Sequence, residues 1–239
     1  MSSTDTPTQR TAISSGNVEL DSKLGGGIPV GSLVMIEGNS GTGKSVLTQQ
    51  LIKGSLQTGF RVTLFTTENT PKSLVKQMQS IDLDILDFLL LGKCKVYPIE
   101  LSQLKHSAAN ELLRAITSLP ITKDQQSILV LDSITSLVTQ GSNSQVVHFF
   151  EECKRLCSTG MTIMLTLHSS ALNNELINPL RAMCDAHLRL NSAQDGQRLV
   201  KTLEVAKVRG AASVTGAIVG FEVEPGWGVR VIPISKARG

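Results

Sequence analysis

Residues 38–45 of this chain read GNSGTGKS, and this octapeptide decides the fold. It matches the phosphate-loop pattern G-x-x-x-x-G-K-[ST] at every fixed position. The apolar run at residues 33–36 predicts a buried strand before it, and the residues after Ser45 predict the first turns of a helix. A strand, a glycine-rich turn and a helix in this order form a cradle for a polyphosphate, because backbone N–H groups and the positive end of the helix face the same anion.

The residues of this octapeptide predict a nucleoside triphosphate site. The Lys44 ammonium would lie beside the β- and γ-phosphates, where it serves binding and catalysis, and the Ser45 hydroxyl would be a ligand of Mg²⁺. The alternative is that the glycines form a turn and nothing more. The expected phosphate contacts are Asn39, Ser40, Gly41, Thr42, Gly43, Lys44, Ser45 and Val46.

Composition is typical of a globular protein. The chain has 239 residues, of which 41% are hydrophobic and 18% charged, and this is enough for a substantial core. The net charge of +3 and the aromatic content of 3% give no footprint for nucleic acid, so no nucleic-acid partner is expected. We expect residues 1–12, rich in Ser, Thr and Pro, to form a disordered tail, and residues 13–239 to form a single domain.

Targeting signals are not evident in the sequence. No run of about 18 apolar residues could span a membrane, and the polar N-terminus lacks the apolar core of a secretion signal. We therefore expect a cytoplasmic protein that reaches a membrane only through a partner. The four cysteines lack zinc-ligand spacing, which favours buried thiols in a reducing compartment over a metal site.

Hydrophobic patterns predict an α/β fold with a mostly parallel sheet covered by helices on both faces. Strands are expected at 61–66, 94–97, 127–132 and 161–167, helices at 71–80, 105–118 and 144–158, and then a polar loop containing Pro179. The C-terminal part of the chain has a different pattern, in which apolar and polar residues alternate. The stretches 186–190, 199–208, 217–223 and 229–232 predict antiparallel strands that extend one edge of the sheet.

Two acids and a histidine each follow a predicted core strand. Ligands of open α/β sheets bind at the carboxyl ends of strands, so Asp132 would lie beside Ser45 and hold Mg²⁺ through a water, unless it is a helix N-cap. Glu68 would orient or deprotonate a water that attacks the γ-phosphate, or else be a solvent-facing acid. His168 would hydrogen-bond the γ-phosphate or cap its own loop.

Lys207 and Arg209 alternate along a predicted strand, so they point to the same face. Two neighbouring cations usually form a solvated face. They are also what an adjacent subunit would need to neutralise a transferring phosphate. Both interpretations stay open on spacing alone.

Several motifs resemble the KaiC-like branch of the RecA superfamily. Residues 16–21 (GNVELD) and 24–29 (LGGGIP) are similar to the entry motif of that branch. The resemblance is closer to the FlaH family, the accessory ATPases of the archaeal flagellum (archaellum) motor. It covers about residues 13–237 and rests on residues 36–45, TTENT at 66–70, CDAHLRL at 184–190, VEPGWG at 223–228 and IPISK at 232–236.

This resemblance implies a RecA-like core that binds ATP and Mg²⁺ and forms a homo-oligomeric ring such as a hexamer. It also implies docking on the motor ATPase (FlaI), and through it a link to the membrane platform protein. In KaiC-like relatives the acid matching Glu68 is catalytic, and the pair matching Lys207 and Arg209 reaches the adjacent subunit's nucleotide. The second acid of the KaiC pattern is Asn69 here, as in FlaH-type sequences, which favours nucleotide occupancy as a signal over rapid hydrolysis.

Two other functions compete with this hypothesis. A DNA-dependent recombination ATPase would need DNA-binding loops, and the only candidate, residues 172–179, has no basic residue. A phosphotransfer regulator of the KaiC type would need a stable phosphoryl acceptor near a subunit boundary, and no Ser or Thr is marked as one. Both alternatives are less favoured than an ATP-binding motor component.

Overall fold

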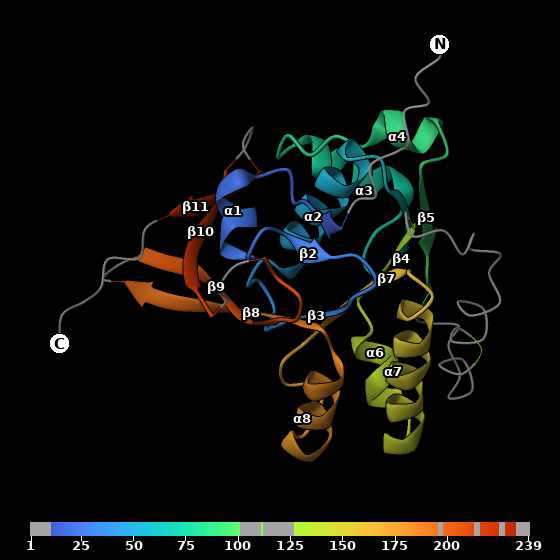
Figure 1. Ribbon diagram of the computed structural model, residues 1–239. Coiled ribbons are helices and arrows are strands. Elements are labelled where there is room, and N and C mark those ends of the chain that lie inside the picture. Colours follow the sequence, from blue (N-terminus) through green and yellow to red (C-terminus); the bar gives the residue numbers. More distant parts are fainter. Residues whose placement is uncertain are drawn as a thin grey trace, which may run out of the picture.

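One continuous β-sheet forms the centre of the molecule. The computed structural model describes residues 11–100, 111, 127–195, 198–212, 216–224 and 228–232. Nine strands within these residues lie in the order β11-β10-β9-β8-β3-β7-β6-β4-β5, and β1 (Ala12–Ile13) pairs separately with β2 (Ile28–Pro29). Figure 1 shows the sheet between two groups of helices.

The middle of the sheet is parallel, which confirms the prediction from the alternation of strands and helices. Its strands are β3 (Leu33–Gly38), β4 (Arg61–Thr66), β5 (Cys94–Pro98), β6 (Ser127–Asp132), β7 (Thr162–Leu167) and the first half of β8 (Ala186–Asp195). Every residue of β3, β6 and β7 is buried, as expected for strands covered on both faces. The carboxyl ends of these strands meet at one edge, where Thr66 lies opposite Asp132 and Ile36 opposite Thr166.

The last strands extend the sheet in antiparallel fashion, which was also predicted. β9 (Arg198–Val208), β10 (Ile218–Glu224) and β11 (Gly228–Ile232) follow β8 in turn. A shift of register between His187 and Leu188 marks a β-bulge where this part begins. Figure 1 shows β10 and β11 beside α1 (Val18–Lys23).

Alternate residues of β3 face two separate hydrophobic cores, as the period of a strand requires. Val34 and Ile36 belong to the core that includes residues of α2 (Lys44–Gln57) and α3 (Pro71–Gln79). Leu33 and Met35 belong to the core that includes residues of α7 (Asn143–Cys157) and α8 (Asn174–Met183). The sheet is therefore the middle layer of three.

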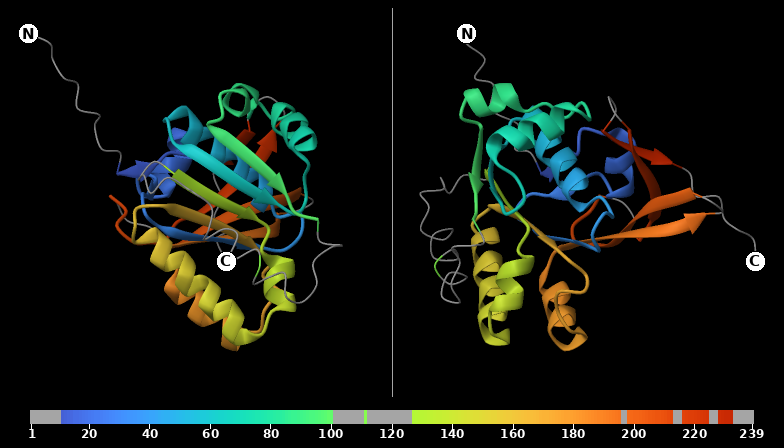
Figure 2. Two further views of the ribbon diagram at one scale, coloured as in Figure 1. Left: turned by 90° about the vertical axis from the view of Figure 1, so that its right-hand side faces the viewer. Right: turned by 180° about the vertical axis from the view of Figure 1, so that it is seen from behind.

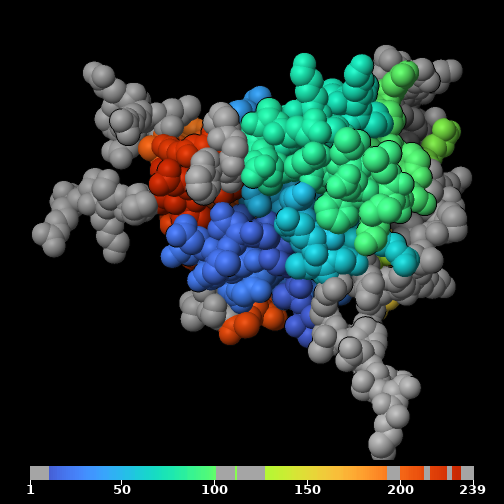
Figure 3. All heavy atoms as spheres, turned by 90° about the horizontal axis from the view of Figure 1, so that it is seen from above, coloured from blue at the N-terminus to red at the C-terminus, as the bar shows by residue number. Residues whose placement is uncertain are grey.

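The two outer layers differ in their helices. α1 and α4 (Leu86–Leu90) lie on the α2 side, and Figure 3 looks onto this face, where α3 and α4, in teal and green, lie beside the N-terminal residues in blue. α6 (Thr135–Gln140) joins α7 and α8 on the opposite side, which Figure 2 shows from behind. None of the described helices is long and apolar enough to cross a bilayer.

α2 is enclosed along most of its length and fixes the position of the phosphate loop. Gln50 donates a hydrogen bond to the Ser15 carbonyl (2.8 Å) and accepts one from the Val229 N–H (3.2 Å), so it joins the N-terminal segment to β11. Gly54 permits the close approach of that segment, because a Cβ there would lie 2.2 Å from the Ser15 carbonyl carbon. The helix that begins with Lys44 is thus held at several points.

The prediction of a loop around Pro179 is wrong, because Pro179 lies inside helix α8. Asn173 caps the helix by accepting a hydrogen bond from the Leu176 N–H (3.0 Å). Leu176, Ile177 and Leu180 are buried against the sheet. This burial offsets the cost of about 3 kcal/mol that an interior proline carries. Tertiary packing therefore overrides the local signal of the proline.

The other predicted elements agree with the structure within one or two residues where it describes them, except that β8 continues to Asp195, beyond the predicted end at residue 190. The helix expected at 105–118 lies outside the described residues apart from residue 111, and most of the expected N-terminal tail lies outside them too. Ala12, the last residue of that tail, belongs to β1 and pairs with Pro29 of β2. Regular structure therefore begins slightly earlier than residue 13. The division into a tail and a single domain stays a prediction.

All four cysteines are free and buried, as predicted. Burial raises the pKa of the Cys94, Cys157 and Cys184 thiols to about 12, and that of Cys153 well above its usual value. Such thiols are inert as nucleophiles and metal ligands. No cluster of metal-ligand side chains occurs in the part of the chain that the structure describes.

Candidate functional site

Five of the predicted site residues come together at the carboxyl edge of the parallel strands. Lys44 and Ser45 open α2 after β3, Glu68 follows β4, Asp132 ends β6, and His168 follows β7. Backbone hydrogen bonds join the loops. The Thr67 N–H donates to the Asp132 carbonyl (2.9 Å), and the Ser169 N–H donates to the Gly38 carbonyl (3.3 Å). The sheet thus assembles residues that are far apart in sequence.

The phosphate loop depends on glycine at three positions. Gly41 and Gly43 have φ angles of +75° and +97°, which favour glycine. A Cβ on Gly38 would lie 2.6 Å from both the Leu190 carbonyl oxygen and Thr42 Oγ1, so only glycine fits there. Gly43 is also the N-cap of α2, and no side chain caps this end of the helix. The first N–H groups of α2 are therefore available to an anion.

Lys44 is buried at the bottom of this loop. Its Nζ donates to the Asn39 carbonyl (2.9 Å), an oxygen that also accepts a hydrogen bond from Thr42 Oγ1 (2.8 Å). Burial lowers the pKa of Lys44, while the charges of Glu68 and Asp132 oppose that shift. The lysine is a desolvated cation whose partner in the loop is a neutral carbonyl, which suits it to a polyphosphate.

Asp132 is buried and surrounded by hydroxyl groups. Thr166 Oγ1 donates a hydrogen bond to its Oδ1 at 2.6 Å. Burial raises the pKa of Asp132, an effect that hydrogen bonds from Thr166 and Ser45 reduce. The alternative role as a helix N-cap is excluded, because the N-cap of α6 is Ile134. The Ser45 hydroxyl and the Asp132 carboxylate form a set of oxygen donors that fits Mg²⁺.

Glu68 borders both the phosphate loop and a surface groove. Ser45 Oγ lies 3.4 Å from its Oε2. Asn69 turns to α3 instead, because its Oδ1 accepts a hydrogen bond from Ser73 Oγ (3.2 Å). The groove has a volume of about 540 Å³ and is lined by Glu68, Asn69, Ser73, Lys76, Gln77 and Ser80. Glu68 is thus the carboxylate of this loop that faces the site.

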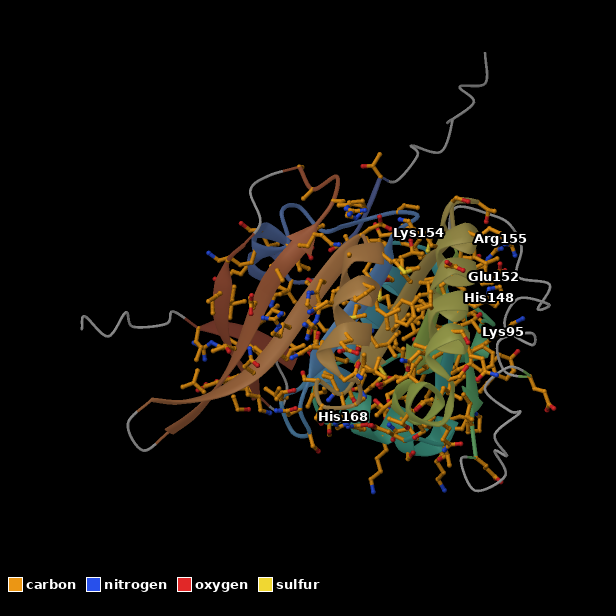
Figure 4. All side chains as sticks on the ribbon, turned by 90° about the horizontal axis from the view of Figure 1, so that it is seen from below. Lys95, His148, Glu152, Lys154, Arg155 and His168 are labelled. Atoms are coloured by element: carbon orange, nitrogen blue, oxygen red, sulfur yellow. The ribbon has the colours of Figure 1, made fainter. Side chains whose placement is uncertain are left out.

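His168 lies at the end of β7 near Lys44 and Glu68. Its backbone N–H donates to Thr135 Oγ1 (3.1 Å). This hydrogen bond fixes the backbone of His168 and does not involve its imidazole. Burial and the charge of Lys44 lower the pKa of His168, so the ring is neutral at pH 7. Figure 4 shows His168 well apart from the charged residues of α7, among them His148 and Arg155.

Lys207 and Arg209 do not reach this site within the same chain. They lie on the α8 side of the sheet, where Lys207 Nζ donates to the Arg181 carbonyl (2.8 Å) and Arg209 Nη2 to the Ala182 carbonyl (3.3 Å). Lys207 Nζ also lies 3.3 Å from the Ala182 carbonyl, so the two cations point to the same face as predicted. Arg209 itself follows the last residue of β9.

The sequence analysis missed residues that complete the site. Thr166 is the buried partner of Asp132, and a polar residue near the end of an apolar strand was the available signal. Phe221 and Lys201 approach the loop from β10 and β9, because a Cβ on Gly43 would lie 3.0 Å from the Phe221 ring and 3.7 Å from Lys201 Cδ. No local sequence pattern predicts these two contacts.

Comparisons with known proteins agree with this geometry. The family model described as "ATPase: KaiC" matches residues 13–236. The archaeal flagellar ATP-binding protein FlaH of Sulfolobus acidocaldarius is 33% identical over 95% of this chain and 99% of its own length. FlaH of Methanocaldococcus jannaschii is 28% identical over 89% of this chain and 91% of its own length.

A solved structure shares the same fold. The crystal structure of the flagellar accessory protein FlaH from Methanocaldococcus jannaschii matches with a TM-score of 0.81 and 27% identity. The match covers 95% of this chain and all of that one. The expected RecA-like core with antiparallel edge strands is therefore confirmed.

Proposed function

The chain belongs to the FlaH family within the KaiC-type ATPases, and from this premise we propose that it is an ATP-binding regulatory component of the archaeal flagellum motor. The observation that carries the proposal is the convergence of Lys44, Ser45, Asp132 and Glu68 around the uncapped start of α2. Each relative named above is a FlaH protein of the archaeal flagellum.

ATP binding follows from the charges of the loop. The Lys44 ammonium would leave the Asn39 carbonyl for the β- and γ-phosphates, since a charge-assisted hydrogen bond is about twice as strong as a neutral one. Backbone N–H groups of residues 39–46 and the N-terminus of α2 would hold the remaining phosphate oxygens. Ser45 and Asp132 would hold Mg²⁺, which supplies positive charge next to the β- and γ-phosphates.

Hydrolysis would be slow or conditional in this arrangement. Glu68 is positioned to orient a water and His168 to contact the γ-phosphate, but Asn69 contributes no second carboxylate. Lys207 and Arg209 lie on the opposite side of the sheet from α2, so a neighbouring copy must supply them to a given nucleotide. This favours a homo-oligomeric ring, in which ATP completes each contact between copies.

The proposed output is docking on the motor ATPase. ATP occupancy would select one of two states of the surface, and a swing from 1:99 to 99:1 needs about 5 kcal/mol of differential binding. The contacts of a γ-phosphate with Lys44, Mg²⁺ and a neighbour's cations are strong enough to supply this. The protein would then act on the cytoplasmic side of the membrane, where its partner joins it to the platform protein.

Titration calorimetry with Mg-ATP tests the first step. Wild-type protein is expected to bind, and Lys44→Ala to lose at least about 100-fold in affinity, because two charge-assisted contacts are worth about 3 kcal/mol or more. Lys53→Ala is the matched control, since Lys53 lies in the same helix but contacts Phe88 and Asp84 outside the loop. Wild-type protein that binds no ATP would overturn the proposal.

Binding to the purified motor ATPase tests the second step. The wild-type protein should bind it more tightly with ATP than without, and Lys44→Ala should be insensitive to nucleotide. Equal affinity in all four conditions would refute the switch. A titration with fluorescent single-stranded DNA addresses the main alternative, and tight salt-dependent binding would favour a DNA-dependent ATPase.

A further inference from the structure

A buried ion cluster lies directly before the phosphate loop, and the sequence analysis assigned no role to its residues. Glu37, the residue before Gly38, is 1% exposed. Its carboxylate accepts a forked pair of hydrogen bonds from Arg181 (Nε 2.9 Å, Nη2 2.5 Å) and contacts His187 Nε2 at 2.9 Å. Burial opposes the charge of Glu37, but the hydrogen bonds from His187 and Arg181 outweigh it and lower its pKa to about 2. The Glu37 carboxylate is therefore ionised and is enclosed by Arg181 and His187.

Backbone carbonyls of Arg181 and of the next residue hold the two cations. The carbonyl of Arg181 accepts from Lys207 Nζ (2.8 Å), and the next carbonyl, that of Ala182, accepts from both Lys207 and Arg209 (3.3 Å each). Carbonyls of a last helical turn carry partial negative charge, which attracts these cations. One turn of α8 thus contacts Glu37 through a side chain and the cation pair through its backbone.

A second connection runs through the sheet. His187, the other partner of Glu37, lies opposite Lys207 in the pairing of β8 with β9. Gly38 in turn packs so tightly against β8 that no side chain would fit, since a Cβ there would lie 2.6 Å from the Leu190 carbonyl oxygen. Displacement at the start of the phosphate loop would therefore reach β8 and the cation pair by direct contact.

We propose that Arg181 is a positioning residue that couples the chain's own phosphate loop to Lys207 and Arg209, and so sets these cations for the nucleotide of a neighbouring copy. The inference rests on the proposed function, in which the pair acts across a contact between copies. Arg181 touches no nucleotide itself. It acts by holding the last turn of α8 against Glu37.

A nearby ion pair provides a matched control. Arg189 contacts Glu204 (3.1 Å) on the neighbouring strand, and both side chains are about one-third exposed. Among the described residues, no hydrogen bond or ion pair joins the side chains of this pair to α8 or to the phosphate loop. Arg189→Gln should therefore leave the cation pair in place, whereas Arg181→Gln should shift the last turn of α8 away from Glu37, and with it the carbonyls that hold the cation pair.

The experiment measures release of a fluorescent ATP analogue (mant-ATP with Mg²⁺) from the full-length protein, alone and in mixtures. Lys44→Ala protomers bind no nucleotide but carry an intact cation pair. Alone, the double variant Lys207→Ala/Arg209→Ala should release mant-ATP about 100-fold faster than wild type, and Arg181→Gln about 10-fold faster. Excess Lys44→Ala protein should bring the release rates of both variants to within about 2-fold of wild type, because its Lys207 and Arg209 contact the nucleotides bound to the variants.

The mixtures separate failure of the inference from failure of its premise. If Lys44→Ala restores the double variant but not Arg181→Gln, the arginine supports only its own loop and the inference is wrong. If the double variant is not restored either, the action of the cations between copies is refuted, and the inference fails with it. Slow release by Arg181→Gln alone, equal to that of Arg189→Gln, would also overturn it.

A second variant covers the case in which Arg181→Gln does not fold. Glu37→Gln/Arg181→Gln removes both charges, and replacement of a whole buried pair is often neutral for stability. It should show the same fast release and the same rescue by Lys44→Ala protein. A structural support alone would not be rescued by another molecule.

Discussion

Two buried carboxylates lie at the same edge of the sheet, and the protein treats them in opposite ways. Glu37 on β3 is contacted by Arg181 and His187, and its pKa is lowered to about 2. Asp132 on β6 forms no ion pair with a described residue, is hydrogen-bonded by hydroxyl groups, and its pKa is raised by burial. Both are less than 10% exposed.

The difference separates a structural charge from a functional one. A buried carboxylate that the chain neutralises itself joins elements, here α8 to β3, and has little capacity for another cation. A buried carboxylate left with hydroxyl partners keeps that capacity and is the one suited to Mg²⁺. The four predictions below test this contrast.

Breaking the closed cluster should have the largest effect. Arg181→Gln leaves the Glu37 carboxylate buried with His187 beside it but without its arginine partner, and it should lower the free energy of unfolding by about 4 kcal/mol. Arg189→Gln, which breaks the partly exposed pair with Glu204, should cost less than about 1 kcal/mol. Urea unfolding of both variants measures this, and equal losses would contradict the contrast.

Acid should remove the contribution of Glu37 in a defined window. Because its pKa is lower in the folded state, its stabilising effect is present above about pH 4.5 and is lost as the pH falls through about 2. The wild-type protein should exceed Glu37→Gln in unfolding free energy by up to about 3 kcal/mol at pH 7, and by much less at pH 3. Urea titrations at the two pH values measure the gap, and a constant gap would refute the assignment.

The phosphate loop should be sensitive to shape rather than to charge. Gly43→Ala combines a φ of +97° with a Cβ 3.0 Å from the Phe221 ring and should destabilise the protein by about 2 kcal/mol. Gly41→Ala has a φ of +75° but nothing within 4 Å of the new Cβ, so about 1 kcal/mol is expected. Thermal unfolding without nucleotide compares them, and the reverse order would be inconsistent with the described packing.

Asp132→Asn should have the smallest effect on stability and a specific effect on metal dependence. It removes a charge that burial disfavours, so the free energy of unfolding at pH 7 should change by less than about 1 kcal/mol or rise. The enhancement of ATP binding by Mg²⁺ should be lost, as calorimetry with and without the ion would measure. A loss of stability as large as that of Arg181→Gln would erase the contrast.

Local patterns were sufficient to predict the site but not the closed cluster. The octapeptide, the apolar strands and the acids at their ends are each readable within a few residues, and the rule for strand ends then brings Lys44, Asp132 and Glu68 together. Glu37 gave no such signal, since its partners Arg181 and His187 are 144 and 150 residues away. A glutamate inside an apolar strand was the sole hint.

Helix α8 shows why the remainder could not be predicted. Its proline favours a loop, and the helix exists because Leu176, Ile177 and Leu180 find a core made by distant elements. The walls of the site were missed for the same reason, because Phe221 reaches Gly43 only through the curvature of a sheet built from the whole chain. Long-range packing supplies what sequence spacing does not.

The proline of α8 has one more consequence. Its ring offers no N–H to the Glu175 carbonyl one turn earlier, so the helical rod is weakest at the midpoint between Asn173 and the cation pair. Asn173 caps the half before the proline, and buried Leu180 and the contact of Arg181 with Glu37 hold the half after it. Both ends of α8 are therefore fixed, although its backbone ladder lacks one hydrogen-bond donor.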